Sequence, residues 1–437
     1  MNLPSIGIEE QDIKVLLSPK AYKKALLHQI KLAKIRIYIT ALYLQDDEAG
    51  REIIEALYQA KEKNSALDVC IFVDAHRAQR GLIGQKEQSG NRAMYLAFAQ
   101  KYLQKINVYG IAVKPKELLG VLHLKGIVVD DTLLYSGASI NNVYLHQMSN
   151  YRLDRYYQIR SSALADSFCQ YLNRCFIETD VAIDLTSEQP FTKKQQKIQS
   201  KRTRSIVKRA NYNYAEVDKS ASIQITPFVG CGKRRNHLNN QICNLLQQSV
   251  ESVVLFTPYF NLPRAVTKQL TLALKRGVKI TVIVGDKTAS DFFIADPEKF
   301  SLIGIIPYLY EQILRKFIKR WQKFISSGQL VFKLWKDGGN SYHLKGMVVD
   351  ETQHMLTGSN LNPRAWGLDL ENGILLNDPK KQLLAGFQQE LSNICQNTHD
   401  ITSYLQIDSH RDYPIKPRKL LARLSLSNID RLLKRFL

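Results

Sequence analysis

The stretch His123-Leu-Lys-Gly-Ile-Val-Val-Asp130 decides the fold of this chain, because it returns as His343-Leu-Lys-Gly-Met-Val-Val-Asp350. Both copies fit the pattern HxKxxxxD, and each is followed by a short apolar stretch and a turn of small residues. The turns read Gly137-Ala-Ser-Ile-Asn141 and Gly358-Ser-Asn-Leu-Asn362. One such motif is weak evidence of function, since a His and a Lys on a strand usually mark a half-exposed edge. Two copies with matching flanks indicate an internal duplication.

The surroundings of the two motifs repeat as well. The segments 35–44 and 250–260 are apolar, end in an aromatic turn and lead into a helix-like stretch. A second apolar run follows at 67–75 and at 278–286, too short for a helix and rich in β-branched residues. We therefore expect an α/β fold of two fused sandwich lobes with mixed central sheets, related by a pseudo-twofold axis, with the active site between them.

The length of 437 residues also suits two lobes, because single hydrophobic cores stop growing near ~250 to 300 residues. We place the first lobe at 1–190, a basic linker at 191–215 and the second lobe at 216–437. The linker assignment depends on residues 193–214, which carry eight basic residues and no acidic one. Such a run favours a solvated connection, with a phosphate-binding arm as the alternative.

The motif residues themselves predict phosphodiester chemistry. Residues i and i+2 of a strand share a face, so His123 projects with Lys125, and His343 with Lys345. If the halves pack face to face, one imidazole attacks phosphorus while the other protonates the departing oxygen and later deprotonates the acceptor. The lysines then stabilise charge on the non-bridging oxygens. This chemistry requires no metal or other cofactor, and we expect none.

Several further polar residues are candidates for supporting roles. Asp130 and Asp350 complete the motifs but lie an odd number of residues from their His, so a structural role is expected. Asp154 and Glu371 occupy comparable places in the two halves, and either is a candidate to accept a hydrogen bond from an imidazole, or is an ordinary surface acid. In the small-residue turns the candidate phosphate ligands are Ser139, Asn141, Asn360 and Asn362.

These motifs resemble the phospholipase D superfamily, whose members pair two of them around a phosphohistidine intermediate. The segments 123–147 and 343–372 are most similar to the bacterial phosphatidylserine synthases of that superfamily. The resemblance implies that CDP-diacylglycerol and L-serine are the substrates and that phosphatidylserine and CMP are the products. It also implies His123 as nucleophile and His343 as general acid and base, or the reverse.

The small-residue turns depart from the superfamily's usual GSxN. Counting from the motif Asp puts the Asn position on Ile140 in the first half and on Asn360 in the second. Aligning the turns themselves pairs Ser139 with Asn360 and Asn141 with Asn362. Both alignments stay open.

A lipid substrate requires contact with a membrane surface, and residues 308–325 have the pattern of a basic amphipathic helix. Its candidate membrane contacts are Arg315, Lys316, Phe317, Lys319, Arg320, Trp321 and Lys323. A core-packing helix with solvated lysines is the alternative, and residues 417–437 have similar character. The net charge of +21 predicts attraction to an anionic membrane, with a ribosome or nucleic acid as further possible partners.

The location and the competing functions follow from the same features. The N-terminus lacks a secretory signal, and no apolar run reaches the ~18 residues of a membrane span. We therefore expect a cytoplasmic protein bound peripherally to the inner face of the cell membrane. The alternative functions are another phospholipase D-type lipid enzyme, such as cardiolipin synthase or phospholipase D, and a nucleic-acid phosphodiesterase.

Overall fold

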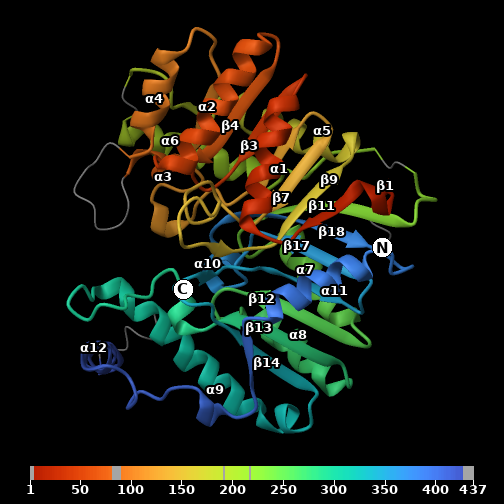
Figure 1. The fold of residues 1–437 in the computed structure, drawn as a ribbon, viewed down its shortest axis with the longest axis vertical. Helices are drawn as coiled ribbons and strands as arrows, with labels where there is room; N and C mark the ends of the chain where they lie inside the picture. The colour runs from red at the N-terminus through yellow and green to blue at the C-terminus, as the bar shows by residue number, and fades with distance from the viewer. Residues whose placement is uncertain (1–3, 81–89, 190–191, 216–217, 427–437) are drawn as a thin grey trace.

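The computed structural model of the chain describes residues 4–80, 90–189, 192–215 and 218–426. The first half of the chain, coloured red to yellow in Figure 1, stacks on the second half, coloured green to blue. Within the described residues one half contains an eight-stranded sheet and the other a nine-stranded sheet.

The two sheets have the same strand order. The first runs β10 (Ile183–Asp184), β5 (Asn107–Ile111), β4 (Asp68–Asp74), β3 (Arg36–Thr40), β6 (Gly126–Val129), β7 (Thr132–Ser136), β9 (Tyr156–Arg160) and β2 (Ile13–Leu16). The second runs β19 (Thr398–Ile401), β14 (Leu330–Trp335), β13 (Lys279–Gly285), β12 (Ser252–Thr257), β16 (Gly346–Val349), β17 (Gln353–Thr357), β18 (Leu370–Asn377), β11 (Ile223–Cys231) and β1 (Ile6–Ile8). Strands β3, β4 and β5 are parallel, as are β12, β13 and β14, whereas the other neighbours are antiparallel. The predicted duplication with mixed sheets is therefore confirmed.

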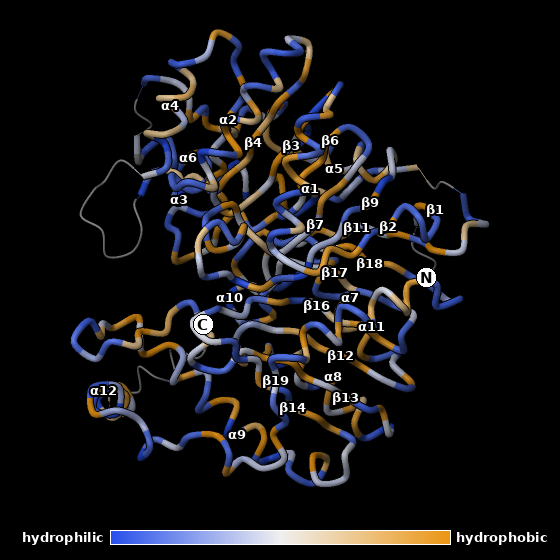
Figure 2. Tube along the Cα trace, in the orientation of Figure 1, coloured by the Kyte–Doolittle hydropathy of each residue, from blue (hydrophilic) through white to orange (hydrophobic). Residues whose placement is uncertain are grey.

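Helices cover the sheets of both halves. In the first half they are α1 (Pro19–Leu32), α2 (Glu48–Lys63), α3 (Ala75–Gln79), α4 (Arg92–Lys101) and α5 (Ser162–Leu172). In the second half they are α7 (His237–Gln248), α8 (Arg264–Lys275), α9 (Ile306–Ser326), α10 (Pro363–Gly367), α11 (Leu384–Cys395) and α12 (Ile415–Leu426). Figure 2 shows hydrophobic residues along the strands and hydrophilic residues on the outer turns. The central strands β6 and β16 are buried along their whole length because both faces of each sheet are covered.

One hydrophobic core spans the boundary between the halves. Tyr135 and Ile159 of the first sheet pack in the same cluster as Ile225, Ile374 and Leu376 of the second. The chain's first strand strengthens this connection, since β1 pairs with β11 in the sheet of the second half. The two sheets are therefore held together by shared apolar contacts, which fix the position of anything built between them.

The basic segment between the halves forms a helix. Helix α6 (Lys193–Val207) begins with a capping box between Thr192 and Gln195. Val207 is buried in the shared core, and Tyr212, just beyond the helix, stacks on Phe168 with the ring centres 4.6 Å apart. The segment is therefore docked on the protein, although most of its basic side chains are exposed.

The aspartates that end the two motifs have one structural role. Asp130 accepts hydrogen bonds from the backbone N–H groups of residues 34–36 at 2.8 to 3.0 Å. Asp350 accepts equivalent bonds from residues 250–252 at 2.8 to 3.0 Å. Each therefore fastens the loop before a central strand to the hairpin after its motif, far from the imidazoles. This placement agrees with the structural role expected from their spacing.

Helix α9 packs an apolar face into the core of the second half. Trp321 is only 5% exposed and lies in one cluster with Leu314, Ile318 and Ile325. The prediction that Trp321 contacts lipid is therefore wrong: its ring serves protein packing, which the same helical spacing of apolar residues also produces. Phe317 is half-buried against the same cluster.

The polar face of α9 keeps most of its charge outside. Arg315 donates hydrogen bonds to the backbone carbonyls of Tyr404 and Ile407. The remaining basic candidates are exposed, namely Lys316, Lys319, Arg320 and Lys323. No helix among the described residues combines the length and the apolarity needed to cross a bilayer.

Candidate active site

Each motif enters the site by pairing with a segment of the other half. The backbone N–H of His123 donates to the carbonyl of Leu370 at 2.9 Å, and that of His343 donates to the carbonyl of Leu153 at 2.8 Å. The second contact extends a two-stranded parallel sheet between β15 (Ser341–Tyr342) and β8 (Arg152–Leu153). The two imidazoles are therefore positioned by equivalent strand pairs, one on each side of the boundary.

Each half supplies a carboxylate that contacts the motif residues of the other half. Nδ1 of His123 lies 2.8 and 2.9 Å from the two carboxylate oxygens of Glu371, which belongs to the second half. Conversely, Asp154 of the first half lies 2.6 Å from Nζ of Lys345 and 3.7 Å from Nδ1 of His343. All five side chains are buried. Neither half therefore contains a complete site alone.

The two imidazoles have different partners at Nδ1. His123 faces the Glu371 carboxylate, which, when ionised, accepts a hydrogen bond from Nδ1–H and leaves Nε2 with its lone pair. His343 faces two donors, because the hydroxyl of Tyr144 lies 2.9 Å from its Nδ1 and the ammonium of Lys345 is also within hydrogen-bond distance. The donors favour the tautomer that carries its proton on Nε2. The two imidazoles therefore favour opposite tautomers, with the lone pair on Nε2 of His123 and the proton on Nε2 of His343.

Burial shifts the acid–base equilibria of the site. It raises the pKa of Glu371 to about 8, although Lys125 and Lys345 oppose the shift. Burial, followed by the charge of Lys125, lowers the pKa of His123 well below 6.5. Burial, followed by Lys345, also lowers the pKa of Lys125 to about 7. Each shift disfavours an isolated charge in the closed site, so a bound anion would stabilise the protonated lysines.

The two lysines are not equivalent. Lys345 is paired with Asp154, whereas Nζ of Lys125 has no hydrogen-bond partner among the described residues, although the residue is only 1% exposed. Asn372 holds the backbone of Lys125 from both sides, by accepting from its N–H and donating to its carbonyl, each at 2.8 Å. A buried ammonium without a partner indicates a place for a negatively charged ligand.

Two glycines make room for the lysines. A Cβ at Gly137 would lie 2.6 Å from Nζ of Lys345, and a Cβ at Gly358 would lie 2.6 Å from Cγ of Lys125. Each lysine therefore passes over the small-residue turn of the other half. This close approach explains why both turns begin with glycine.

The strand register decides how the two turns align. In the first half Val129 pairs with Thr132, and in the second half Val349 pairs with Gln353, so the second hairpin is one residue longer. Counting residues from the motif aspartates therefore misaligns the two turns by one position. Aligning the turns is correct, and Ser139 corresponds to Asn360.

The last residues of the turns are caps. Asn141 accepts a hydrogen bond from the backbone N–H of Tyr144, and Asn362 accepts one from that of Ala365, both at 2.9 Å. The side-chain oxygens of Asn141 and Asn362 are therefore already bound to backbone N–H groups. Ser139 is buried at the same place as Asn360, whose Oδ1, like Oγ of Ser359, has no partner within the described part of the chain. The earlier turn residues therefore stay the candidates for a phosphate contact.

Two functional residues carry no motif signal in the sequence. Asn372 follows Glu371, but the corresponding residue of the first half is Arg155, which forms an ion pair with Glu390 at 2.7 Å instead. Tyr144 reaches His343 of the other half through its hydroxyl. Both contacts depend on how the halves dock, which a motif comparison within one half does not contain.

Comparison with known proteins agrees with this site. The family model described as cardiolipin synthase, PLD-like domain, matches residues 26–175 and 242–395. The chain is 40% identical over 441 residues to the CDP-diacylglycerol–serine O-phosphatidyltransferase of Haemophilus influenzae, covering 100% of this chain and 97% of the relative. It is 41% identical over 436 residues to the enzyme of that name from Escherichia coli, covering 100% and 96%. A crystal structure of phosphatidylserine synthase from Haemophilus influenzae matches with a TM-score of 0.96 and 40% identity, covering 100% of this chain and 98% of the other.

Proposed function

This chain belongs to the phosphatidylserine synthases of the phospholipase D-like family, and we propose from this premise that it transfers the phosphatidyl group of CDP-diacylglycerol to L-serine. The products are phosphatidylserine and CMP. The observation that supports the chemistry best is the exchange of carboxylates across the boundary, which brings both His-Lys pairs into one buried site.

In the first step Nε2 of His123 attacks the phosphorus atom attached to diacylglycerol. A P–N bond forms and the P–O bond to CMP breaks, while His343 donates its Nε2 proton to the departing oxygen and takes a proton at Nδ1 from the ammonium of Lys345, which is within hydrogen-bond distance. Glu371 stabilises the imidazole through Nδ1 as its positive charge develops. The unpartnered ammonium of Lys125 and the ammonium of Lys345 lie beside these rings and would bind the non-bridging oxygens.

In the second step L-serine takes the place of CMP. His343, now without its Nε2 proton, removes the proton from the serine hydroxyl, and the serine oxygen attacks phosphorus as the P–N bond breaks. As Nδ1 of His343 returns its proton to Lys345, the step restores His123, His343 and Lys345 to their starting forms. The same His343 thus acts as acid and then as base, as microscopic reversibility requires.

The function is tested by incubating the purified protein with CDP-diacylglycerol in detergent micelles and measuring CMP with and without L-serine. Serine-dependent release of CMP together with phosphatidylserine is expected. Release that water alone supports equally well would instead identify a phospholipase D. Transfer to phosphatidylglycerol with no response to serine would identify a cardiolipin synthase, and cleavage of DNA without lipid would identify a nucleic-acid phosphodiesterase.

The pKa of Glu371 predicts the pH dependence of the first step. Its pKa is raised to about 8, so the carboxyl loses its proton as the pH rises through that value and only then accepts Nδ1–H from His123. At saturating CDP-diacylglycerol, whose phosphate groups keep Lys125 protonated, the rate of CMP exchange into CDP-diacylglycerol is therefore expected to rise with pH up to about 8. Glu371→Gln cannot ionise and should flatten this rise while lowering the rate about 10- to 100-fold. Glu298→Gln, an exposed acid, is the control. A steep rise that persists in Glu371→Gln would assign the ionisation elsewhere.

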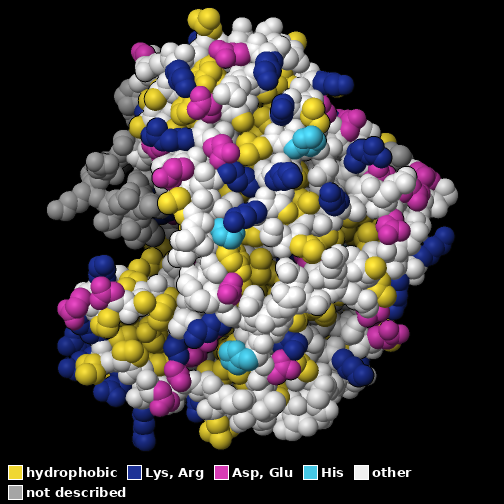
Figure 3. Space-filling view, in the orientation of Figure 1, with side chains coloured by type: hydrophobic (Ala, Val, Ile, Leu, Met, Phe, Trp, Pro, Cys, Tyr) yellow, Lys and Arg dark blue, Asp and Glu magenta, His cyan; other side chains and the backbone are white. Residues whose placement is uncertain are grey.

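We propose that the protein binds the membrane through basic surface of its second half. The helix α9 exposes four basic side chains, and Lys416 and Lys419 of α12 line a groove with Phe300 and Leu302, which is 66% exposed. Figure 3 shows hydrophobic side chains gathered toward the lower left, next to Lys and Arg. Anionic lipid and a partly apolar rim together favour reversible docking.

Substitutions that remove charge test the basic surfaces of α9 and α12 one at a time. Replacing Lys316, Lys319, Arg320 and Lys323 by glutamine is expected to lower partitioning onto anionic vesicles roughly 10²- to 10³-fold at low salt, at about 1 kcal/mol per residue. Replacing Lys416 and Lys419 tests α12 in the same sedimentation assay, with zwitterionic vesicles as the control. Unchanged binding in both variants would contradict a basic docking surface.

A further inference from the structure

A pair of opposite charges beside His343 has no part in the phosphoryl chemistry. Nη1 of Arg152 lies 3.4 Å from Oδ2 of Asp291, and the two side chains are 16% and 18% exposed. Arg152 also donates through Nε to Oγ of Ser341 at 3.1 Å, and Asp291 accepts from the hydroxyl of Tyr259. Arg152 comes from the first half and Asp291 from the segment after β13 in the second, so both halves build this pair too.

Two aromatic rings connect the pair to His343. The rings of Tyr144 and Tyr259 each lie edge-on to the imidazole with centroids 5.7 Å from it. The guanidinium of Arg152 stands 4.9 Å from the centre of the Tyr144 ring, and Tyr259 holds the Asp291 carboxylate. The two charges therefore flank the imidazole that deprotonates the acceptor in the proposed reaction.

We propose that Arg152 and Asp291 form the subsite that recognises the amino-acid end of the acceptor. This inference rests on the proposed function. L-Serine is a zwitterion, so its carboxylate would bind the guanidinium fork of Arg152 and its ammonium would bind the Asp291 carboxylate. The hydroxyl is the remaining polar group, and binding both charges would direct it toward His343.

The charges of the pair suit such a ligand. Burial alone would raise the pKa of Asp291, but Arg152 and His343 lower it below 3.8, so the carboxylate is ionised at neutral pH. The separation of 3.4 Å exceeds the ~2.7 to 2.9 Å of a close charge-assisted hydrogen bond. Each charge therefore has capacity for a second partner of opposite sign. A zwitterion supplies both partners without changing the net charge of the buried site.

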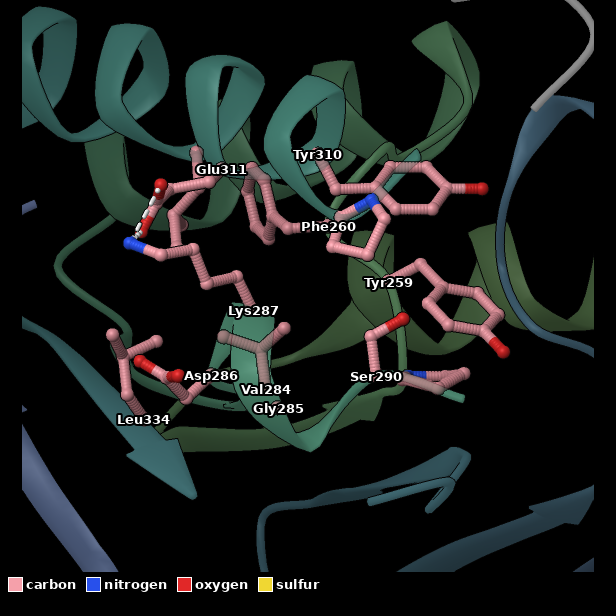
Figure 4. Close-up of a pocket in the computed structure, with 13 residues that line it drawn as sticks. Tyr259, Phe260, Val284, Gly285, Asp286, Lys287, Ser290, Tyr310, Glu311 and Leu334 are labelled. Carbon is pink, nitrogen blue, oxygen red and sulfur yellow. Dashed lines mark hydrogen bonds and ion pairs between the residues drawn. The ribbon is translucent and has the colours of Figure 1, made fainter. Parts of the chain in front are cut away.

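A recess adjoins this pair on the side of Tyr259. Tyr259, Ser290 and Tyr310 line it, whereas Arg152, Asp291 and His343 do not. Figure 4 shows the hydroxyl groups of Tyr259 and Tyr310 directed to the same side, away from the ion pair of Lys287 and Glu311. Ser290 directly precedes Asp291 in the chain. The recess therefore adjoins the proposed subsite through Tyr259, whose hydroxyl donates to Asp291.

The test compares acceptors and uses the first step as an internal reference. Exchange of labelled CMP into CDP-diacylglycerol reports formation of the phosphatidyl enzyme without serine. For Asp291→Asn, the ratio of kcat/KM for L-serine to the exchange rate is expected to fall at least tenfold. The preference for L-serine over L-glycerate, which has a hydroxyl in place of the ammonium, should fall with it. Asp296→Asn, an exposed acid five residues further on, is the matched control.

The variant Arg152→Gln tests the positive charge of the pair in the same way. The preference for L-serine over ethanolamine, which lacks the carboxylate, is expected to fall at least tenfold. If the pair only holds the two tyrosines in place, its loss would lower CMP exchange and transfer to every acceptor by one common factor. That result would overturn the subsite. If the wild-type protein shows neither CMP exchange nor serine-dependent CMP release, the proposed function fails, and the subsite fails with it.

Discussion

Replacing His123 by alanine is expected to abolish CMP release and serine transfer together, whereas replacing His343 by alanine is expected to leave a single turnover of CMP release. His123 supplies the atom that bonds to phosphorus, so its loss removes the first step, and kcat should fall about 10⁴-fold or more. CMP departs as a phosphate ester anion, for which protonation is a modest help. The serine hydroxyl is a poor nucleophile until a base removes its proton, so the loss of His343 obstructs the second step most.

Rapid-quench kinetics separate these outcomes. The His343→Ala protein should release CMP in a burst that approaches one equivalent per active site and then stop, with or without serine. His123→Ala should give no burst. His399→Ala serves as a control, because this histidine is exposed on β19, the edge strand of the second sheet. A burst from His123→Ala and none from His343→Ala would reverse the two roles.

The two lysines are expected to separate activity from stability. In Lys125→Met the loss of an unpartnered buried ammonium should lower kcat about 10²- to 10³-fold, because transition-state charge loses a donor. Its free energy of unfolding should stay the same or increase, since a desolvated charge is replaced by an apolar side chain. In Lys345→Met the carboxylate of Asp154 loses its partner at 2.6 Å. That variant should lose both activity and about 3 to 5 kcal/mol of stability.

Urea unfolding followed by circular dichroism measures the difference between the two variants. If Lys345→Met is too unstable to purify, Lys345→Met with Asp154→Asn removes both charges and should recover most of the stability but not the activity. Equal destabilisation by Lys125→Met and Lys345→Met would contradict the asymmetry of the two ammonium groups. A fully active Lys125→Met would show that phosphate binds elsewhere.

The duplication in the sequence was sufficient to predict much of the fold. Repeated apolar runs ahead of each motif predicted mixed sheets, because strands that are buried on both faces leave continuous β-branched segments. The period of two residues along a strand predicted that His123 and Lys125 lie together, and the odd spacing predicted a separate place for Asp130, which accepts a hydrogen bond from the backbone N–H of Ile35. These are local relations, and the sequence contains them directly.

Relations across the boundary were not accessible in that way. The proximity of Glu371 to His123 depends on docking of the two halves, and so does the contact of Tyr144 with His343. The extra residue in the second hairpin left the turn alignment open until the strand register decided it. The burial of Trp321 illustrates a different limit, because a core-facing helix and a membrane-surface helix have the same periodicity.

The central claim is that two imidazoles from distant parts of the chain act on one phosphorus atom and that His123 forms the bond to it. The most direct test is to incubate His343→Ala with CDP-diacylglycerol, quench in base and locate the phosphatidyl group by mass spectrometry of peptides. The modification is expected on His123 and should be absent from a protein that also carries His123→Ala. A phosphatidyl group on any other residue, or full CMP release without a modified peptide, would contradict the account.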